Sequence, residues 1–107
     1  MFEVLVRNYV TELRPADAEI RKKLDFGYSY SDKEIEFFEL RPQFRNPENI
    51  LRLPYAKIRR IKSKGIWKLY WKRGSGKWEL YNPHPEDRSL EQIIDVIRKD
   101  VHGCFLG

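Results

Sequence analysis

The segment WKLYWKRGSGKWELY, residues 67–81, most restricts the fold, because its large side chains alternate with polar ones on either side of a glycine-containing turn. This alternation is typical of a β-hairpin with one buried face. Gly74 and Ser75 fit the central positions of a two-residue type II′ turn, which would pair Trp71 with Trp78. This register predicts a core face with Trp67, Leu69, Trp71, Trp78 and Leu80, and an outward face with Lys68, Tyr70, Lys72, Lys77, Glu79 and Tyr81.

A second hairpin is expected over residues 26–40, where large apolar residues alternate on both sides of a polar Ser-Asp-Lys reversal. The pattern predicts that Tyr28 lies opposite Phe37 and that Tyr30 lies opposite Ile35.

Residues 55–62 predict a further strand, joined to the first hairpin by a short loop that ends at Gly65. A regular strand cannot bury both Ile58 and Ile61 on one face, since side chains alternate along it. A β-bulge at Arg59 and Arg60 would restore the alternation and turn additional positive charge outward.

Helical periodicity flanks these strands. Residues 2–13 carry apolar side chains at helical spacing, and Pro15 suits the start of a short helix reaching residue 24, with Ile20 facing inward. Ser89 with Gln92 matches a capping box for a C-terminal helix whose apolar stripe reaches Val101, before a stop at Gly103. We therefore expect an α+β fold with N-terminal helices, an antiparallel sheet of about five strands, a C-terminal helix, and the helices on one sheet face.

Length and composition limit the class of protein. A chain of 107 residues is expected to form a single domain, residues 1–107. Its 41% hydrophobic and 14% aromatic residues exclude intrinsic disorder, and no apolar run is long enough to span a membrane. The absence of an export signal and the single cysteine, Cys104, favour a cytoplasmic location.

Positive charge is concentrated in one part of the chain. Residues 52–77 contain ten basic residues and no acidic one, while the other eleven basic residues are accompanied by all sixteen acidic ones, so the rest carries −5. Such a segment either keeps the sheet soluble and discourages edge pairing or forms an anion-binding surface.

Catalytic and metal-binding patterns are weak. His84, His102 and Cys104 lack the paired spacing of a structural zinc site, and no phosphate-binding glycine loop precedes a helix. Cys104 is expected to pack with Phe105 and Leu106 as an apolar tail. We therefore expect no cofactor, no metal and no enzymatic activity.

Several short motifs together carry a family resemblance: Arg41-Pro42, Pro54 with Ala56-Lys57, GIWKLYWKR with KWELY, and the ending GCFLG. In these motifs the chain resembles the bacterial family known as domain of unknown function 3024. The resemblance covers most of the chain. It implies a shared layout but assigns no activity and no site residue.

Two functions are compatible with the sequence. The first is weak binding of a polyanion or single-stranded nucleic acid on a basic sheet face, where cations meet phosphates and tyrosines stack on bases. The candidate residues for this site are Arg59, Arg60, Lys68, Tyr70, Lys72, Lys77 and Tyr81. The alternative is a protein-interaction or self-associating domain that uses Phe38 and Leu40 as an outward apolar patch.

Overall fold

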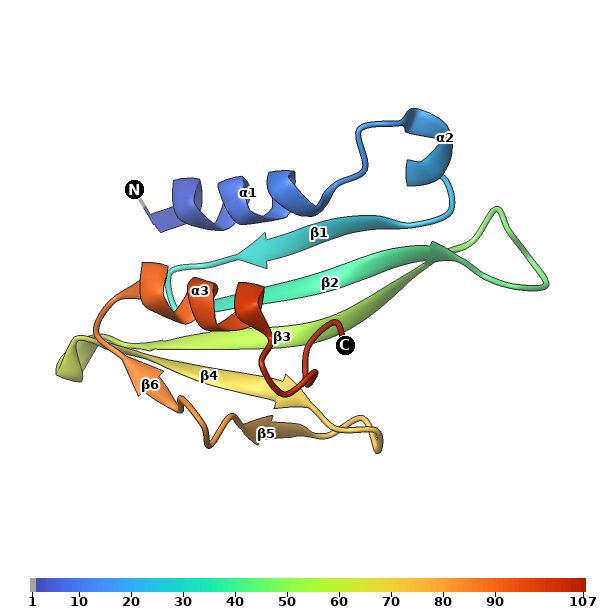
Figure 1. The fold of residues 1–107 in the computed structure, drawn as a ribbon. Coiled ribbons are helices and arrows are strands. Elements are labelled where there is room, and N and C mark those ends of the chain that lie inside the picture. Colours follow the sequence, from blue (N-terminus) through green and yellow to red (C-terminus); the bar gives the residue numbers. More distant parts are fainter. Residues whose placement is uncertain (1) are drawn as a thin grey trace.

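The structure of the chain is a computed structural model that describes residues 2–107. Figure 1 shows its helices and strands, which follow one another along the chain as α1 (Phe2–Leu13), α2 (Ala18–Arg21), β1 (Asp25–Tyr30), β2 (Glu34–Pro42), β3 (Ile50–Ile61), a 3-10 turn (Lys62–Lys64), β4 (Ile66–Lys72), β5 (Trp78–Leu80), β6 (Glu86–Asp87) and α3 (Leu90–Lys99).

The strands form one antiparallel sheet in the order β1-β2-β3-β4-β5, and β6 also pairs with β4. Helices α1 and α3 lie on the same face of this sheet (Figure 1). The predicted α+β arrangement is confirmed. We call the uncovered face, opposite α1 and α3, the outer face.

The core lies between the helices and the inner sheet face. Side chains from α1, α3 and the three central strands meet there, because each of these elements has one apolar side. The largest side chains that are fully buried in it are Tyr9, Phe37, Ile35, Ile58, Leu69, Ile93, Ile97 and Val6.

The β1–β2 hairpin has the predicted register, with Tyr28 opposite Phe37 and Tyr30 opposite Ile35. In β3 the predicted bulge is wrong. The irregularity lies at Tyr55, where the pairing shifts between Phe37 and Phe38 of β2, and Tyr55 therefore faces α1.

Because β3 is regular from residue 56 onward, Arg59 and Arg60 point to opposite faces of the sheet. Arg59 pairs with Lys68 on the outer face, and Arg60 pairs with Trp67 on the inner face. The expectation that both arginines face outward is thus wrong for Arg60.

The β4–β5 hairpin has a different register from the predicted one. Lys72 lies opposite Trp78, so Trp71 does not pair with Trp78. The Gly76 N–H donates to Arg73 O at 2.8 Å, and Gly76 is left-handed with φ 89°, which makes a three-residue loop of Gly74, Ser75 and Gly76. One extra loop residue moves every side chain of the second strand to the other face. Trp78 consequently lies on the outer face.

Helices α2 and α3 are both shorter than the sequence predicted. Ser89 Oγ accepts from Gln92 N–H at 3.3 Å, as the capping pattern predicted, but α3 ends at Lys99 because Asp100 adopts a left-handed conformation with φ 44°. The predicted inward positions of Val101 and Ile20 are wrong, since both side chains are exposed. Within residues 2–107, no helix has the length and apolar character needed to cross a membrane.

Candidate nucleic-acid interface

The outer face of β3, β4 and β5 carries cations and aromatic rings at adjacent positions. Lys57 lies opposite Tyr70, which in turn lies opposite Leu80. One row along, Arg59 lies opposite Lys68, and on the other side Lys72 lies opposite Trp78. Cross-strand neighbours in an antiparallel sheet have Cβ atoms about 5 Å apart. These side chains therefore form a continuous surface.

Trp78 is the central ring of this surface. Lys57 Nζ lies 4.6 Å from the ring centroid, and Lys72 Nζ lies 5.6 Å from it. Both distances fall in the range of cation–π interactions. The ring is half-buried, so part of it remains open to solvent between two ammonium groups.

Acidic side chains neutralise part of the positive charge. Glu34 of β2 lies 3.7 Å from Lys57 and 4.0 Å from Arg59. Among residues 2–107, no carboxylate lies within 4.0 Å of the ammonium groups of Lys68, Lys72 or Lys77. Of these three lysines, Lys68 and Lys72 lie on the outer face, where Lys68 has Glu86 of β6 as its cross-strand neighbour.

Two of the predicted site residues pack against other side chains and are not part of this surface. Arg60 is on the inner face, where its guanidinium contacts Asp32 at 3.3 Å and covers the ring of Phe2 at 4.9 Å. Tyr81 is 2% exposed and packs on Phe105 with ring centroids 4.9 Å apart, and burial raises the pKa of its hydroxyl. Arg60 and Tyr81 therefore pack on the inner side of the sheet and are not part of the outer face.

The structure brings Arg59, Lys68, Tyr70 and Lys72 together on the outer face. Lys77 lies in the adjoining loop opposite Arg73, and the three-residue loop gives it the same side of the sheet as Glu79, so its predicted outward position is wrong. Sequence reasoning missed Lys57 and Trp78. Lys57 could have been found, because it precedes Arg59 by two residues and side chains two apart on a strand point to the same face. Trp78 could not, because its face depends on whether the loop holds two residues or three.

The histidines and the cysteine lie elsewhere. His84 Nε2 is 2.9 Å from Asp87 Oδ2. The pKa of Asp87 is lowered mainly by the hydrogen bond from the Ser89 N–H and to a lesser extent by the one with His84. Cys104 is half-buried beside the docked ring of Phe105. In the part of the chain that the structure describes, no group of three or more His, Cys, Asp or Glu side chains could hold a metal ion.

Comparison with known proteins places the chain in a family. Residues 2–107 match the family described as domain of unknown function (DUF3024), and the chain therefore belongs to that family. The predicted resemblance is confirmed. No curated protein and no solved structure shows significant similarity to the chain.

Proposed function

We propose that this protein is a non-enzymatic binding module whose outer face binds single-stranded nucleic acid or a related polyanion. The observation that carries the proposal is the position of Trp78 between Lys57 and Lys72 on an uncovered sheet face. Base stacking on an aromatic ring beside a cationic groove is the usual means of sequence-tolerant binding to single strands.

The arrangement of rings and charges supports this proposal. Tyr70 and Trp78 lie on the same face on neighbouring strands, and each is flanked by lysines of β3 or β4. Phosphates of a strand that crosses this face meet Lys57, Arg59, Lys68 and Lys72 while its bases stack on the two rings. We also propose a cytoplasmic location, where single-stranded RNA is abundant.

A salt titration tests the proposal. Fluorescence anisotropy with a labelled single-stranded oligonucleotide should show affinity that decreases with salt. Four phosphate contacts give a slope of log affinity against log salt near −3, from about 0.7 per contact on single strands. The double variant Lys68→Gln, Lys72→Gln should flatten the slope by about half.

The matched control is the double variant Lys23→Gln, Arg45→Gln, which removes two exposed cations outside the outer face. Its slope should remain close to that of the unmodified protein. Absence of binding at low salt, where counterion release favours association most, would exclude the proposal.

A second candidate function is self-association through the distal arm, which we define as the projecting end of the β2–β3 hairpin, residues 41–53. The predicted patch at Phe38 is wrong, because Arg52 covers the ring and leaves it 4% exposed. Large apolar side chains are exposed on the arm instead, namely Phe44 at 94%, Ile50 at 56%, Leu51 at 42% and Leu53 at 40%.

Exposed apolar groups beside an open strand edge favour association. β4 pairs with β3 only from Ala56 to Ile61, so the edge of the arm on that side has no neighbouring strand in residues 2–107. Sedimentation velocity over a concentration series tests this function. Leu51→Lys with Leu53→Lys should convert a dimer to a monomer, whereas Val101→Lys, at another exposed apolar site, should not.

A further inference from the structure

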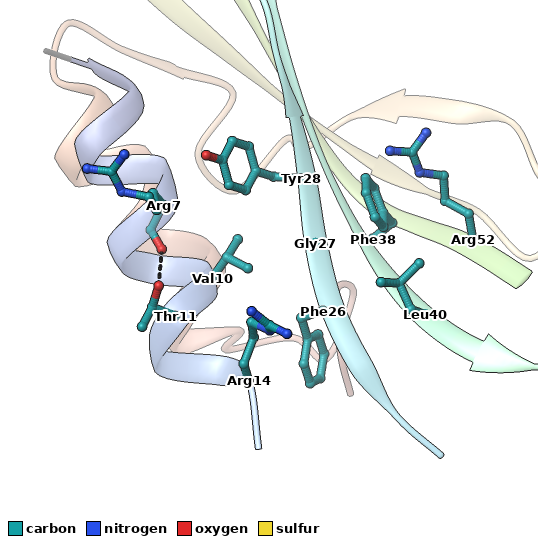
Figure 2. Close-up of a pocket in the computed structure, with 10 residues that line it drawn as sticks. All are labelled: Arg7, Val10, Thr11, Arg14, Phe26, Gly27, Tyr28, Phe38, Leu40 and Arg52. Atoms are coloured by element: carbon teal, nitrogen blue, oxygen red, sulfur yellow. Dashed lines mark hydrogen bonds between the residues drawn. The ribbon is translucent and has the colours of Figure 1, made fainter. Parts of the chain in front are cut away.

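The β1 edge of the sheet borders a groove of about 590 Å³ that is separate from the outer-face surface of β4 and β5. Figure 2 shows α1 on one side of β1, with Arg7, Val10, Thr11 and Arg14, and Phe38, Leu40 and Arg52 on the other. Phe26, Gly27 and Tyr28 of β1 line the groove between these two groups.

The backbone of β1 offers hydrogen-bonding groups to this groove. In an antiparallel pair, every second residue directs its backbone N–H and C=O toward the partner strand. Ser31 N–H donates to Glu34 O at 2.9 Å, so the backbone groups of Ser29 and Gly27 also point toward β2. The amide and carbonyl groups of Tyr28 and Tyr30 therefore point away from β2. The backbone groups of Phe26 point away from β2 as well, but its N–H already donates to Asp25 Oδ1 at 2.8 Å.

Gly27 brings the outer wall of the groove close to the strand edge. The ring of Phe38 lies against the Gly27 backbone, since a Cβ on Gly27 would be 2.5 Å from Phe38 Cε1. The guanidinium carbon of Arg52 lies 3.9 Å from the centroid of the same ring. Arg52 thus extends its charge across β2 toward β1, although it belongs to β3.

Two arginines of the groove are available to an anion. Arg14 is engaged by Asp25 through two hydrogen bonds of 2.9 and 3.0 Å, which lower the pKa of that carboxyl. For Arg7 and Arg52, no carboxylate of residues 2–107 lies within 4.0 Å. Glu3, one turn before Arg7, accepts from the Tyr28 hydroxyl at 3.1 Å. Arg7 lies on the helix side of β1 and Arg52 on the outer side.

We propose that an extended segment of a partner protein, carrying two adjacent acidic residues, adds to the sheet as a strand along β1. Successive side chains of a strand point to opposite faces. Two neighbouring carboxylates therefore reach Arg7 on one face and Arg52 on the other. The backbone of the segment pairs with Tyr28 and Tyr30, as in other cases of strand addition to a sheet edge.

The edge favours a peptide over a nucleic acid as the occupant. A peptide presents alternating amide donors and carbonyl acceptors at the spacing of the free groups of β1, whereas a sugar-phosphate backbone has no such donors. The guanidinium groups of Arg7 and Arg52, which no carboxylate of residues 2–107 approaches within 4.0 Å, favour an acidic partner.

The probe is a fluorescein-labelled ten-residue peptide of threonine and valine with two adjacent glutamates at its centre. We expect saturable binding, and we expect protection from hydrogen exchange at the amides of Tyr28 and Tyr30. Arg7→Gln and Arg52→Gln should each weaken binding by about two- to fivefold, the effect of one exposed ion pair. A peptide with glutamines in place of the glutamates should bind more weakly than the probe.

Backbone methylation of the probe tests strand addition directly. N-methyl groups on alternate residues block the edge that faces β1 in one peptide and the opposite edge in its counterpart. The first should lose at least about tenfold in affinity, and the second should bind like the probe. Equal affinities of the two peptides, whether high or low, would overturn the proposal.

Two protein controls separate this groove from the proposed polyanion surface. Arg45→Gln removes an exposed arginine outside the groove and should leave peptide affinity unchanged. The double variant Lys68→Gln, Lys72→Gln should weaken oligonucleotide binding only. An oligonucleotide that displaces the peptide from the unmodified protein, with its own affinity reduced by Arg7→Gln, would show that the groove binds nucleic acid and would overturn the proposal.

Discussion

The ring of Phe38 packs on the backbone of Gly27, its partner across β1 and β2, so closely that a Cβ at Gly27 would lie 2.5 Å from Phe38 Cε1. Phe38 is the only large apolar side chain of the outer face of β2 that is almost fully buried. The absence of a side chain at Gly27 and the stacked guanidinium of Arg52 together explain this burial.

Gly27→Ala should therefore destabilise the protein by about 1 to 3 kcal/mol, because the Phe38 ring must leave its position or the strands must separate. Urea denaturation measures the change. Gly74→Ala is the matched control, since a Cβ there meets no atom within 4 Å, and it should change stability by less than about 0.5 kcal/mol. Equal effects of the two substitutions would contradict the packing of Phe38 on Gly27.

Trp78→Ala and Tyr70→Ala should each weaken oligonucleotide binding by about 1 to 3 kcal/mol while leaving the salt slope unchanged, because stacking releases no counterions. Trp71→Phe, on the inner face opposite Glu79, should leave affinity unaltered. Anisotropy titrations at three salt concentrations provide both quantities, and circular dichroism verifies that each variant is folded. A changed slope for Trp78→Ala would show that the ring acts by positioning the lysines.

The C-terminal tail depends on a single carboxylate. Asp100 accepts from the backbone N–H groups of Phe105, Leu106 and Gly107 at 3.1, 2.8 and 2.9 Å. Asp100→Ala should cost about 1 to 3 kcal/mol through these bonds and its left-handed backbone, and should increase the reaction rate of Cys104 with a thiol reagent. Asp100→Asn keeps an acceptor and tolerates the same backbone, so its effects should be smaller. Identical thiol rates in all three proteins would show that the tail is docked without Asp100.

Alkaline pH should destabilise the protein through a buried tyrosine pair. Tyr9 and Tyr55 share a hydrogen bond of 2.9 Å, and burial is the largest cause of the raised pKa of both hydroxyls. A raised pKa in the folded state means that this stability is present below the unfolded pKa of about 10 and decreases as the pH rises above it. The unfolding free energy should therefore decrease between pH 9 and 11.

The double variant Tyr9→Phe, Tyr55→Phe isolates this contribution. Removing both partners leaves no unsatisfied hydroxyl, so stability at pH 7 should change little. The decrease in unfolding free energy between pH 9 and 11 should be smaller than in the unmodified protein. A decrease of the same size in both proteins would assign the effect to other groups.

The sequence alone predicted the elements whose signals are local. Tyr28 and Phe37 alternate on either side of one short reversal, and the predicted pairing puts Tyr28, Tyr30, Ile35 and Phe37 on a single face. Ser89 and Gln92 likewise define the start of α3, because capping involves residues three apart. The alternation of side chains along residues 67–72 also predicted that Lys68, Tyr70 and Lys72 lie together on the outer face.

Tertiary structure decided the features for which local energies are nearly balanced. A two-residue turn at Gly74-Ser75 and a three-residue loop ending at Gly76 are both good glycine turns, so the loop itself does not select the face of Trp78. The long-range packing of Tyr81 on Phe105 accompanies the observed register, in which Tyr81 is buried. The bulge at Tyr55 similarly accompanies a hydrogen bond to Tyr9, a residue of α1. Contacts between residues distant in the chain determined both registers, because moving a strand by one position exchanges its buried and exposed faces at little cost to the turn.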